Sequence, residues 1–107
     1  MVERAPAAYL NNKEREAICQ AGVRIGKQVD YSCAGTVEFL MDAKSREFFF
    51  IEVNPRVQVE HTVTEEITGI DIVKAQFLLA SGAKIGDDIC GVPEQQDIKM
   101  KGHAIQS

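Results

Sequence analysis

Residues 51–66 place carboxylate, amide and guanidinium groups at alternate positions along one stretch of the chain. In an extended strand, successive side chains point to opposite faces, so residues two apart share a face. The polar set comprises Glu52, Asn54, Arg56, Gln58 and Glu60, and the intervening aliphatic set, expected to face a core, comprises Ile51, Val53, Val57 and Val59. A charged face backed by aliphatic side chains suits a site that holds a divalent cation and a small anion together.

Glu38 supplies a second carboxylate if residues 34–42 and 47–54 pair as antiparallel strands. Both segments are rich in Val, Phe and Ile, and a polar break separates them. If Ala43 faces Glu47, the same register places Glu38 opposite Glu52, with Cβ atoms about 4.5–5.5 Å apart. A register that differs by one residue would put the two carboxylates on opposite faces.

Two opposed carboxylates repel each other unless a cation lies between them. Mg²⁺ or Mn²⁺ fits such hard oxygen ligands, with phosphate oxygens and water completing the shell. Asn54 adds a neutral oxygen on the face of Glu52. The alternative is a solvent-facing strand in which each glutamate has its own cationic neighbour.

Arg56 can make a bidentate contact to a planar oxyanion such as carboxylate, carbonate or phosphate. Glu60 nearby can act as a general base. The alternative is a plain ion pair between Arg56 and Glu60. His61 is more typical of a hydrogen-bonded spacer than of a metal ligand.

Two helices are predicted to flank these strands. The first covers residues 12–29, capped by Asn11 or Asn12, and the second covers residues 71–81, capped by Asp71 and stopped by Gly82. The first helix carries an apolar stripe at helical spacing, formed by Ala17, Ile18, Ala21, Ile25 and Val29.

The remaining segments are predicted to be less regular. Residues 1–10 form an irregular lead-in, 57–68 a loop with short helical turns, and 101–107 a short strand. The fold class is therefore α+β, with an antiparallel sheet and flanking helices, in one domain over residues 1–107.

Composition excludes several classes of function. The chain of 107 residues has a net charge of −4, which argues against a nucleic-acid surface, and it holds no apolar run of membrane-spanning length. The three cysteines are odd in number and far apart, which favours buried thiols in a reducing compartment. The expected location is the cytoplasm, or the mitochondrial matrix if the source is a eukaryote.

The chain closely resembles the biotin carboxylase component of biotin-dependent carboxylases, which belong to the ATP-grasp superfamily. The resemblance covers essentially the whole chain and is carried by the runs Gly35–Leu40, Phe50–Glu65, Thr68–Val73 and Gly102–Gln106. The form His-Thr-Val-Thr-Glu at 61–65 is most similar to the pyruvate carboxylase subfamily. In this family, ATP and bicarbonate give carboxyphosphate, and the carboxyl group then moves to N1 of biotin.

The resemblance implies roles for the polar residues described above. Glu38 and Glu52, with Asn54 in the same cluster, would ligate the Mg²⁺ or Mn²⁺ ions that bridge the ATP phosphates. The bicarbonate pocket would comprise Arg56, Gln58 and the backbone amide of Val59, and Glu60 would deprotonate bicarbonate.

Family members are several times longer than this chain, which matches the C-terminal portion of the ATP-grasp domain. The resemblance implies that the rest of the carboxylase and a biotinylated carrier domain are partners. The isolated chain is expected to be inactive and to self-associate through bared apolar surface. The alternative is a free-standing metal- or nucleotide-binding module that regulates a partner without catalysis.

Overall fold

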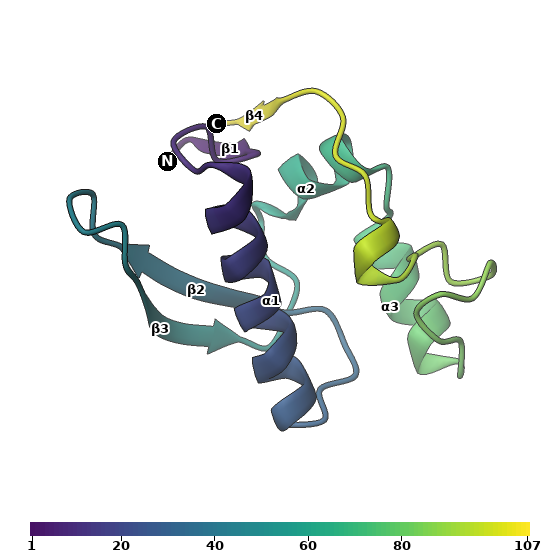
Figure 1. Ribbon diagram of the computed structural model, residues 1–107. Helices are drawn as coiled ribbons and strands as arrows, with labels where there is room; N and C mark the ends of the chain where they lie inside the picture. The colour runs from purple at the N-terminus through teal and green to yellow at the C-terminus, as the bar shows by residue number, and fades with distance from the viewer. The chain divides into compact units, whose positions relative to one another are not determined.

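The computed structural model describes residues 1–107, which divide into two compact units. One unit is Tyr9–Arg56, and the other combines Met1–Ala8 with Val57–Ser107. The elements (Figure 1) are β1 (Glu3–Ala5), α1 (Asn12–Gln28), β2 (Thr36–Met41), β3 (Phe48–Asn54), α2 (His61–Thr68), α3 (Ile72–Ala80), the 3₁₀ helix η1 (Gln95–Asp97) and β4 (Ala104–Gln106). Antiparallel strands with helices confirm the predicted α+β class.

Helix α1 begins where the sequence predicts because Asn11 and Glu14 form a reciprocal capping box. The Glu14 amide donates to Asn11 Oδ1 at 2.8 Å, and the Asn11 amide donates to Glu14 Oε2 at 2.9 Å. Both contacts satisfy amides that the first turn leaves without helical partners. The helix ends at Gln28, one residue short of the predicted boundary.

Helix α1 lies across one face of the β2–β3 hairpin (Figure 1). A Cβ atom at Gly22 would lie 3.9 Å from Val37 Cγ2, so the helix backbone passes close to β2. Phe39 lies two residues after Val37 in β2. Its ring packs edge-on against the ring of Phe48, with centroids 5.5 Å apart, and against the ring of Phe50, with centroids 6.3 Å apart.

The buried stripe predicted for α1 is only partly correct. Ala21 is buried, and Ile18 and Ile25 are half-buried, but Ala17 and Val29 are exposed. The small hairpin is too narrow to cover the whole length of the helix.

The hairpin pairs Glu38 with Glu52, as the sequence predicts, but by a different route. Ala43 does not face Glu47, because the Asp42 amide donates to the Glu47 carbonyl at 2.8 Å and the turn spans residues 43–46. This turn sets a register that differs by one residue from the prediction. A β-bulge next to Glu38 then shifts the pairing by one residue and restores the predicted register.

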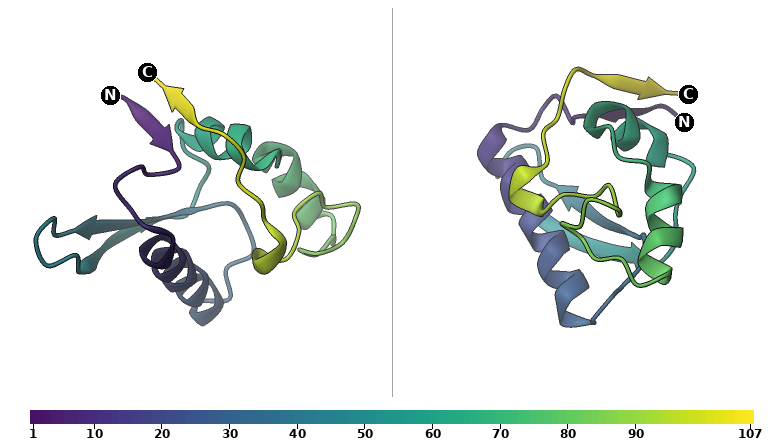
Figure 2. Two further views of the ribbon diagram at one scale, coloured as in Figure 1. Left: turned by 45° about the horizontal axis from the view of Figure 1, so that its top comes forward. Right: turned by 90° about the vertical axis from the view of Figure 1, so that its right-hand side faces the viewer.

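The second unit contains α2, α3 and a two-stranded sheet of β1 and β4. The short strand predicted near the C-terminus is confirmed as β4, which pairs antiparallel with β1 (Figure 2). The loop with short helical turns predicted over residues 57–68 is partly correct, because residues 61–68 form the eight-residue helix α2. The irregular lead-in predicted over residues 1–10 is wrong in part, because it contains β1. Helix α3 follows its prediction, since Asp71 Oδ1 accepts from the Lys74 amide at 2.8 Å.

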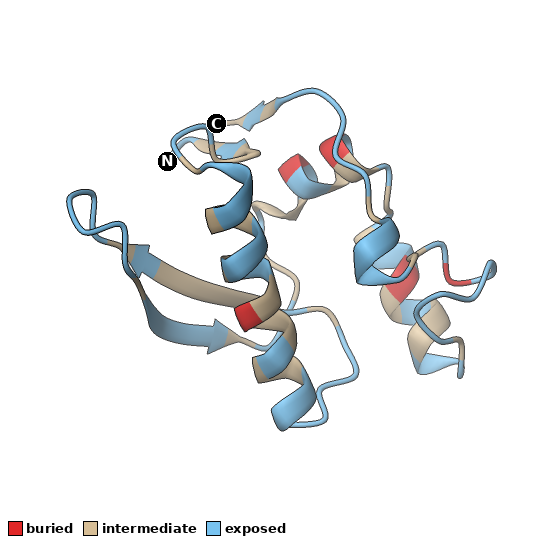
Figure 3. Ribbon diagram, viewed as in Figure 1, coloured by how far each residue is buried: buried red, intermediate tan, exposed pale blue.

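Few side chains are buried (Figure 3). The core positions are Ala21 in α1, Val63 and Ile67 in α2, Ala75 in α3, and Cys90. Several apolar residues predicted to face a core are exposed instead, namely Ile51, Val53 and Val59. The prediction of buried thiols holds for Cys90 but not for Cys19 and Cys33, which are exposed. No helix has the length and apolar character needed to cross a membrane.

Candidate functional site

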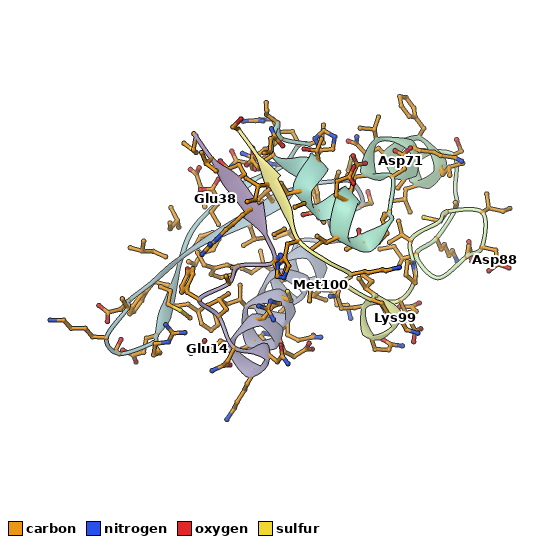
Figure 4. The ribbon with its side chains drawn as sticks, turned by 90° about the horizontal axis from the view of Figure 1, so that it is seen from above. Glu14, Glu38, Asp71, Asp88, Lys99 and Met100 are labelled. Atoms are coloured by element: carbon orange, nitrogen blue, oxygen red, sulfur yellow. The ribbon has the colours of Figure 1, made fainter.

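Glu38, Glu52 and Asn54 gather on the open face of the hairpin, and we call them the carboxylate cluster. The Asn54 side-chain amide donates to Glu38 Oε1 at 2.9 Å and to Glu52 Oε1 at 3.3 Å. Glu38, labelled in Figure 4, is half-buried, whereas Glu52 is exposed. An NH₂ group therefore bridges two carboxylates that are direct partners across the strands.

The β-bulge creates this cluster. Near the turn, Phe39 pairs with Phe50. If that register continued without a bulge, Glu38 would lie opposite Ile51, and Glu52 would point to the face that α1 covers. The extra residue in β3 reverses the alternation once, so Glu52 and Asn54 join the face of Glu38. Bulges commonly re-aim side chains next to functional sites.

The donor set fits a hard divalent cation that a ligand shares. Glu38 and Glu52 offer carboxylate oxygens, and a half-turn of the Asn54 amide would present its oxygen where the NH₂ group now lies. No group of three or more acidic, histidine or cysteine side chains gathers in the chain. Since Mg²⁺ takes six oxygen ligands and usually keeps waters or phosphates among them, the cluster suits a phosphate-bound metal.

The backbone around Asn54 is fixed from two sides. The Arg56 amide donates to the Asn54 carbonyl at 2.8 Å, which closes a three-residue turn around Pro55. A Cβ atom at Gly35 would lie 3.2 Å from the same carbonyl and 3.0 Å from the Tyr31 ring, so a larger residue there would crowd both groups. The strand ends at Asn54, next to Pro55, as the sequence predicts. Arg56 therefore does not continue the alternation, and the shared polar face that an extended run would give stops at Asn54.

Gln58, Val59, Glu60 and His61 form a tight turn at the start of α2, which we call the 58–61 turn. The His61 amide donates to the Gln58 carbonyl at 3.2 Å, and Glu60 has φ −76° and ψ 1°, as expected at the third position of a type I turn. No acceptor within the chain takes the N–H groups of Val59 and Glu60. Two backbone donors on one turn are therefore available to an anion.

Side chains of the 58–61 turn also keep polar atoms available. Gln58 Oε1 is buried and makes no hydrogen bond within the chain. Glu60 is the N-cap residue of α2, but its side chain makes no capping hydrogen bond. Arg56 belongs to the other compact unit, so the predicted residues divide between two groups: the carboxylate cluster with Arg56, and the 58–61 turn.

Two side chains, one within the 58–61 turn and one from β4, make hydrogen bonds to its carbonyl groups. His61 Nδ1 lies 2.7 Å from the Gln58 carbonyl oxygen, and its Nε2 lies 3.4 Å from Glu65 Oε1. Gln106 of β4 donates from Nε2 to the Val59 carbonyl at 3.2 Å and accepts a hydrogen bond from the Thr62 hydroxyl. The hydrogen bond of His61 agrees with the spacer role predicted for it, whereas nothing local to Gln106 indicates its contact with Val59.

Comparisons with known proteins show what the chain is similar to. The sequence model of the carbamoyl-phosphate synthase L chain, ATP binding domain, matches residues 1–87. Pyruvate carboxylase of Bacillus subtilis is 52% identical over 107 residues, which are 100% of this chain and 9% of that protein. Pyruvate carboxylase of human mitochondria is 49% identical over 106 residues, 99% of this chain and 9% of that protein.

Solved structures show the same fold. A complete pyruvate carboxylase from Rhizobium etli superposes with a TM-score of 0.95 at 56% identity, covering 97% of this chain and 10% of that one. The biotin carboxylase domain of Hydrogenobacter thermophilus 2-oxoglutarate carboxylase, in complex with MgADP, ADP and bicarbonate, superposes with a TM-score of 0.87 at 42% identity. It covers 98% of this chain, which spans 22% of that structure.

Proposed function

The chain belongs to the carbamoyl-phosphate synthase L chain ATP-binding domain family, and we propose that it forms the metal- and bicarbonate-binding part of a biotin carboxylase. Its relatives are pyruvate carboxylases, of which it spans 9%, and its structural neighbours are biotin carboxylase domains with the ATP-grasp fold. The enzyme that contains this segment would be an ATP-dependent ligase, most similar to pyruvate carboxylase.

The observation that carries the proposal is the pairing of Glu38 with Glu52, bridged by Asn54 at 2.9 and 3.3 Å. These three side chains would hold Mg²⁺ or Mn²⁺ together with ATP phosphate oxygens. The metal would neutralise charge on the phosphates during transfer. Without such a cation, two carboxylates opposed across a sheet destabilise it.

The bicarbonate step would use the residues that follow the hairpin. Arg56 would hold the bicarbonate carboxylate face, with the Gln58 side chain and the Val59 amide as further donors. Glu60 would accept the bicarbonate proton, and the resulting oxyanion would attack the γ-phosphorus of ATP. The bond between the β–γ bridging oxygen and phosphorus would break, giving ADP and carboxyphosphate. The carboxyl group would then pass to N1 of biotin as its C–O bond to phosphate breaks, and inorganic phosphate would leave with the N1 proton.

The Hydrogenobacter biotin carboxylase domain, a complex with both MgADP and bicarbonate, supports this assignment of ligands. Biotin would arrive on a carrier domain, and the remaining ATP contacts would come from the rest of the carboxylase. The competing function is a regulatory module that binds a metal–nucleotide complex without turnover.

Substitutions at Arg56 and Glu60 test the proposal in the full-length carboxylase that carries this segment. Arg56→Ala and Glu60→Gln should each slow bicarbonate-dependent ADP release by about 10²–10⁴-fold, the usual contribution of such groups. The matched controls Arg24→Ala and Glu66→Gln, at exposed positions on α1 and α2, should stay near the unmodified rate. Near-normal ADP release by both site variants would favour the regulatory module instead.

The isolated 107-residue chain should be catalytically silent, because holding phosphates in line is most of what a protein contributes to phosphoryl transfer. It should also associate with itself, since Leu40 is 64% exposed and Phe49 is 55% exposed on the hairpin. Sedimentation and a coupled ADP assay on the purified chain would check both expectations. A clean monomer with bicarbonate-stimulated ATP hydrolysis would contradict them.

A further inference from the structure

The Gln58 carbonyl accepts two hydrogen bonds from one residue. The His61 amide donates to it at 3.2 Å, and His61 Nδ1 lies 2.7 Å from the same oxygen. A carbonyl oxygen can only accept, so the Nδ1 atom must carry the hydrogen. The ring therefore closes the 58–61 turn a second time, beyond the backbone bond that defines the turn.

The contact between His61 and the Gln58 carbonyl also fixes the direction of the Val59 N–H, because both groups belong to one planar peptide. In a trans peptide, the C=O of one residue and the N–H of the next lie in one plane and point opposite ways. By holding the Gln58 oxygen toward α2, His61 turns the Val59 N–H away from the helix. That N–H has no acceptor within the chain.

Gln106 applies the same constraint to the following peptide. Its Nε2 donates to the Val59 carbonyl at 3.2 Å, which turns the Glu60 N–H away from β4. The Gln106 amide is itself oriented, because its oxygen accepts from the Thr62 hydroxyl. Two successive peptide planes, 58–59 and 59–60, are thus each held by a side chain.

We propose that His61 is a positioning residue for anion binding, with Gln106 as its partner: it aims the Val59 amide at the oxyanion without touching it. This inference rests on the proposed bicarbonate site and adds the residues that preorganise its backbone donor. Donors fixed before the ligand arrives cost no reorganisation when charge develops, so the effect should fall on bicarbonate rather than on ATP.

Substitutions of His61 distinguish the hydrogen bond made by Nδ1 from any made by Nε2. Asparagine places its side-chain NH₂ near the Nδ1 position, and glutamine places it near the Nε2 position, so His61→Asn keeps the donor to Gln58 and His61→Gln loses it. In the full-length carboxylase, His61→Gln and His61→Phe should raise the KM for bicarbonate about tenfold, the effect of losing one aimed hydrogen bond to an anion. The KM for ATP should not change, and His61→Asn should restore the bicarbonate KM to near the unmodified value.

A second variant and a control guard against misfolding. Gln106→Met keeps the length of the side chain but removes the donor, and it should also raise only the bicarbonate KM. His103→Phe, at the exposed second histidine of the same unit, should leave both KM values unchanged. An unchanged bicarbonate KM in His61→Gln and Gln106→Met, with Arg56→Ala impaired, would overturn the positioning role and leave the proposed function standing. Near-normal activity of Arg56→Ala and Glu60→Gln would instead remove the proposed function and this inference with it.

Discussion

The carboxylate cluster and the 58–61 turn differ in how the fold brings their polar groups together. The cluster joins side chains from two strands, and Glu38 and Asn54 meet across 16 positions of sequence. The turn is a contiguous run whose exposed donors are backbone amides. In the first region the polar groups are side chains and the backbone supplies the register, whereas in the second the available donors are backbone amides and side chains hold their peptide planes.

This difference determines which changes should damage each region. The cluster depends on the carboxylates of Glu38 and Glu52 and on the β-bulge that places these two residues opposite each other. The turn depends on the peptide planes, so a side chain such as Val59, which is 78% exposed, contributes little.

Val59 provides the strongest contrast between backbone and side chain. Val59→Pro removes the N–H but suits the second position of a type I turn, where proline is favoured. We expect it to raise the bicarbonate KM of the full-length carboxylase about tenfold, the effect of losing one hydrogen bond to an anion. Val59→Ala keeps the N–H and should be silent. Equal steady-state kinetics for the two variants would show that this amide does not bind bicarbonate.

Glu38→Gln should change metal binding and stability in opposite directions. It removes a ligand, but it also removes the repulsion between two opposed carboxylates, which amounts to about 0.2–1 kcal/mol for a cross-strand pair. Chemical unfolding of the chain without divalent cations should therefore show a small gain in stability. Glu47→Gln, near the turn of the same hairpin, is the control. A clear loss of stability in Glu38→Gln would mean that the pair does not repel in the metal-free chain.

Glu14 and Arg46 form an ion pair that tests the hairpin unit outside the site. Arg46 Nη2 lies 2.6 Å from Glu14 Oε2, and this hydrogen bond, with that of the Asn11 amide, lowers the pKa of Glu14 from 4.5 to about 2. Because the folded pKa is depressed, the pair stabilises the unit fully above pH 4.5, and this contribution is lost as the pH falls toward 2.

An NMR titration of the Glu14 carboxyl would measure this pKa directly. Arg46→Gln should raise the pKa of Glu14 toward its ordinary value, and Lys44→Gln, a change in the same turn, should leave it unaltered. A Glu14 carboxyl that titrates near 4.5 in the unmodified chain would contradict the ion pair.

Much of the fold could be predicted because its signals are local. Asn11 and Asp71 cap α1 and α3 as the sequence indicates, and the alternation of β2 and β3 marks the hairpin. The sequence also predicts the pairing of Glu38 with Glu52, but the turn assumed for it is wrong and a β-bulge corrects the register. A bulge depends on how strands and helix pack together, so no short sequence pattern predicts its position.

The turn and its supports were harder to predict. The pattern of residues 57–68 indicates a loop because α2 is only one short helix from His61 to Thr68, too brief for a clear 3.6-residue periodicity. The contact of Gln106 with Val59 joins positions 47 residues apart. Long-range contacts of this kind follow from tertiary packing and leave no trace in local sequence.

We propose that Glu38 and Glu52 bind a divalent metal ion together. Mn²⁺ titrated into the 107-residue chain should selectively broaden the NMR signals of Glu38, Glu52 and Asn54. Glu38→Gln and Glu52→Gln should each weaken this binding at least about tenfold, since even residues that only support metal ligands contribute about 10–100-fold. Glu47→Gln should bind as the unmodified chain does. Unchanged Mn²⁺ affinity in both site variants would contradict the claim.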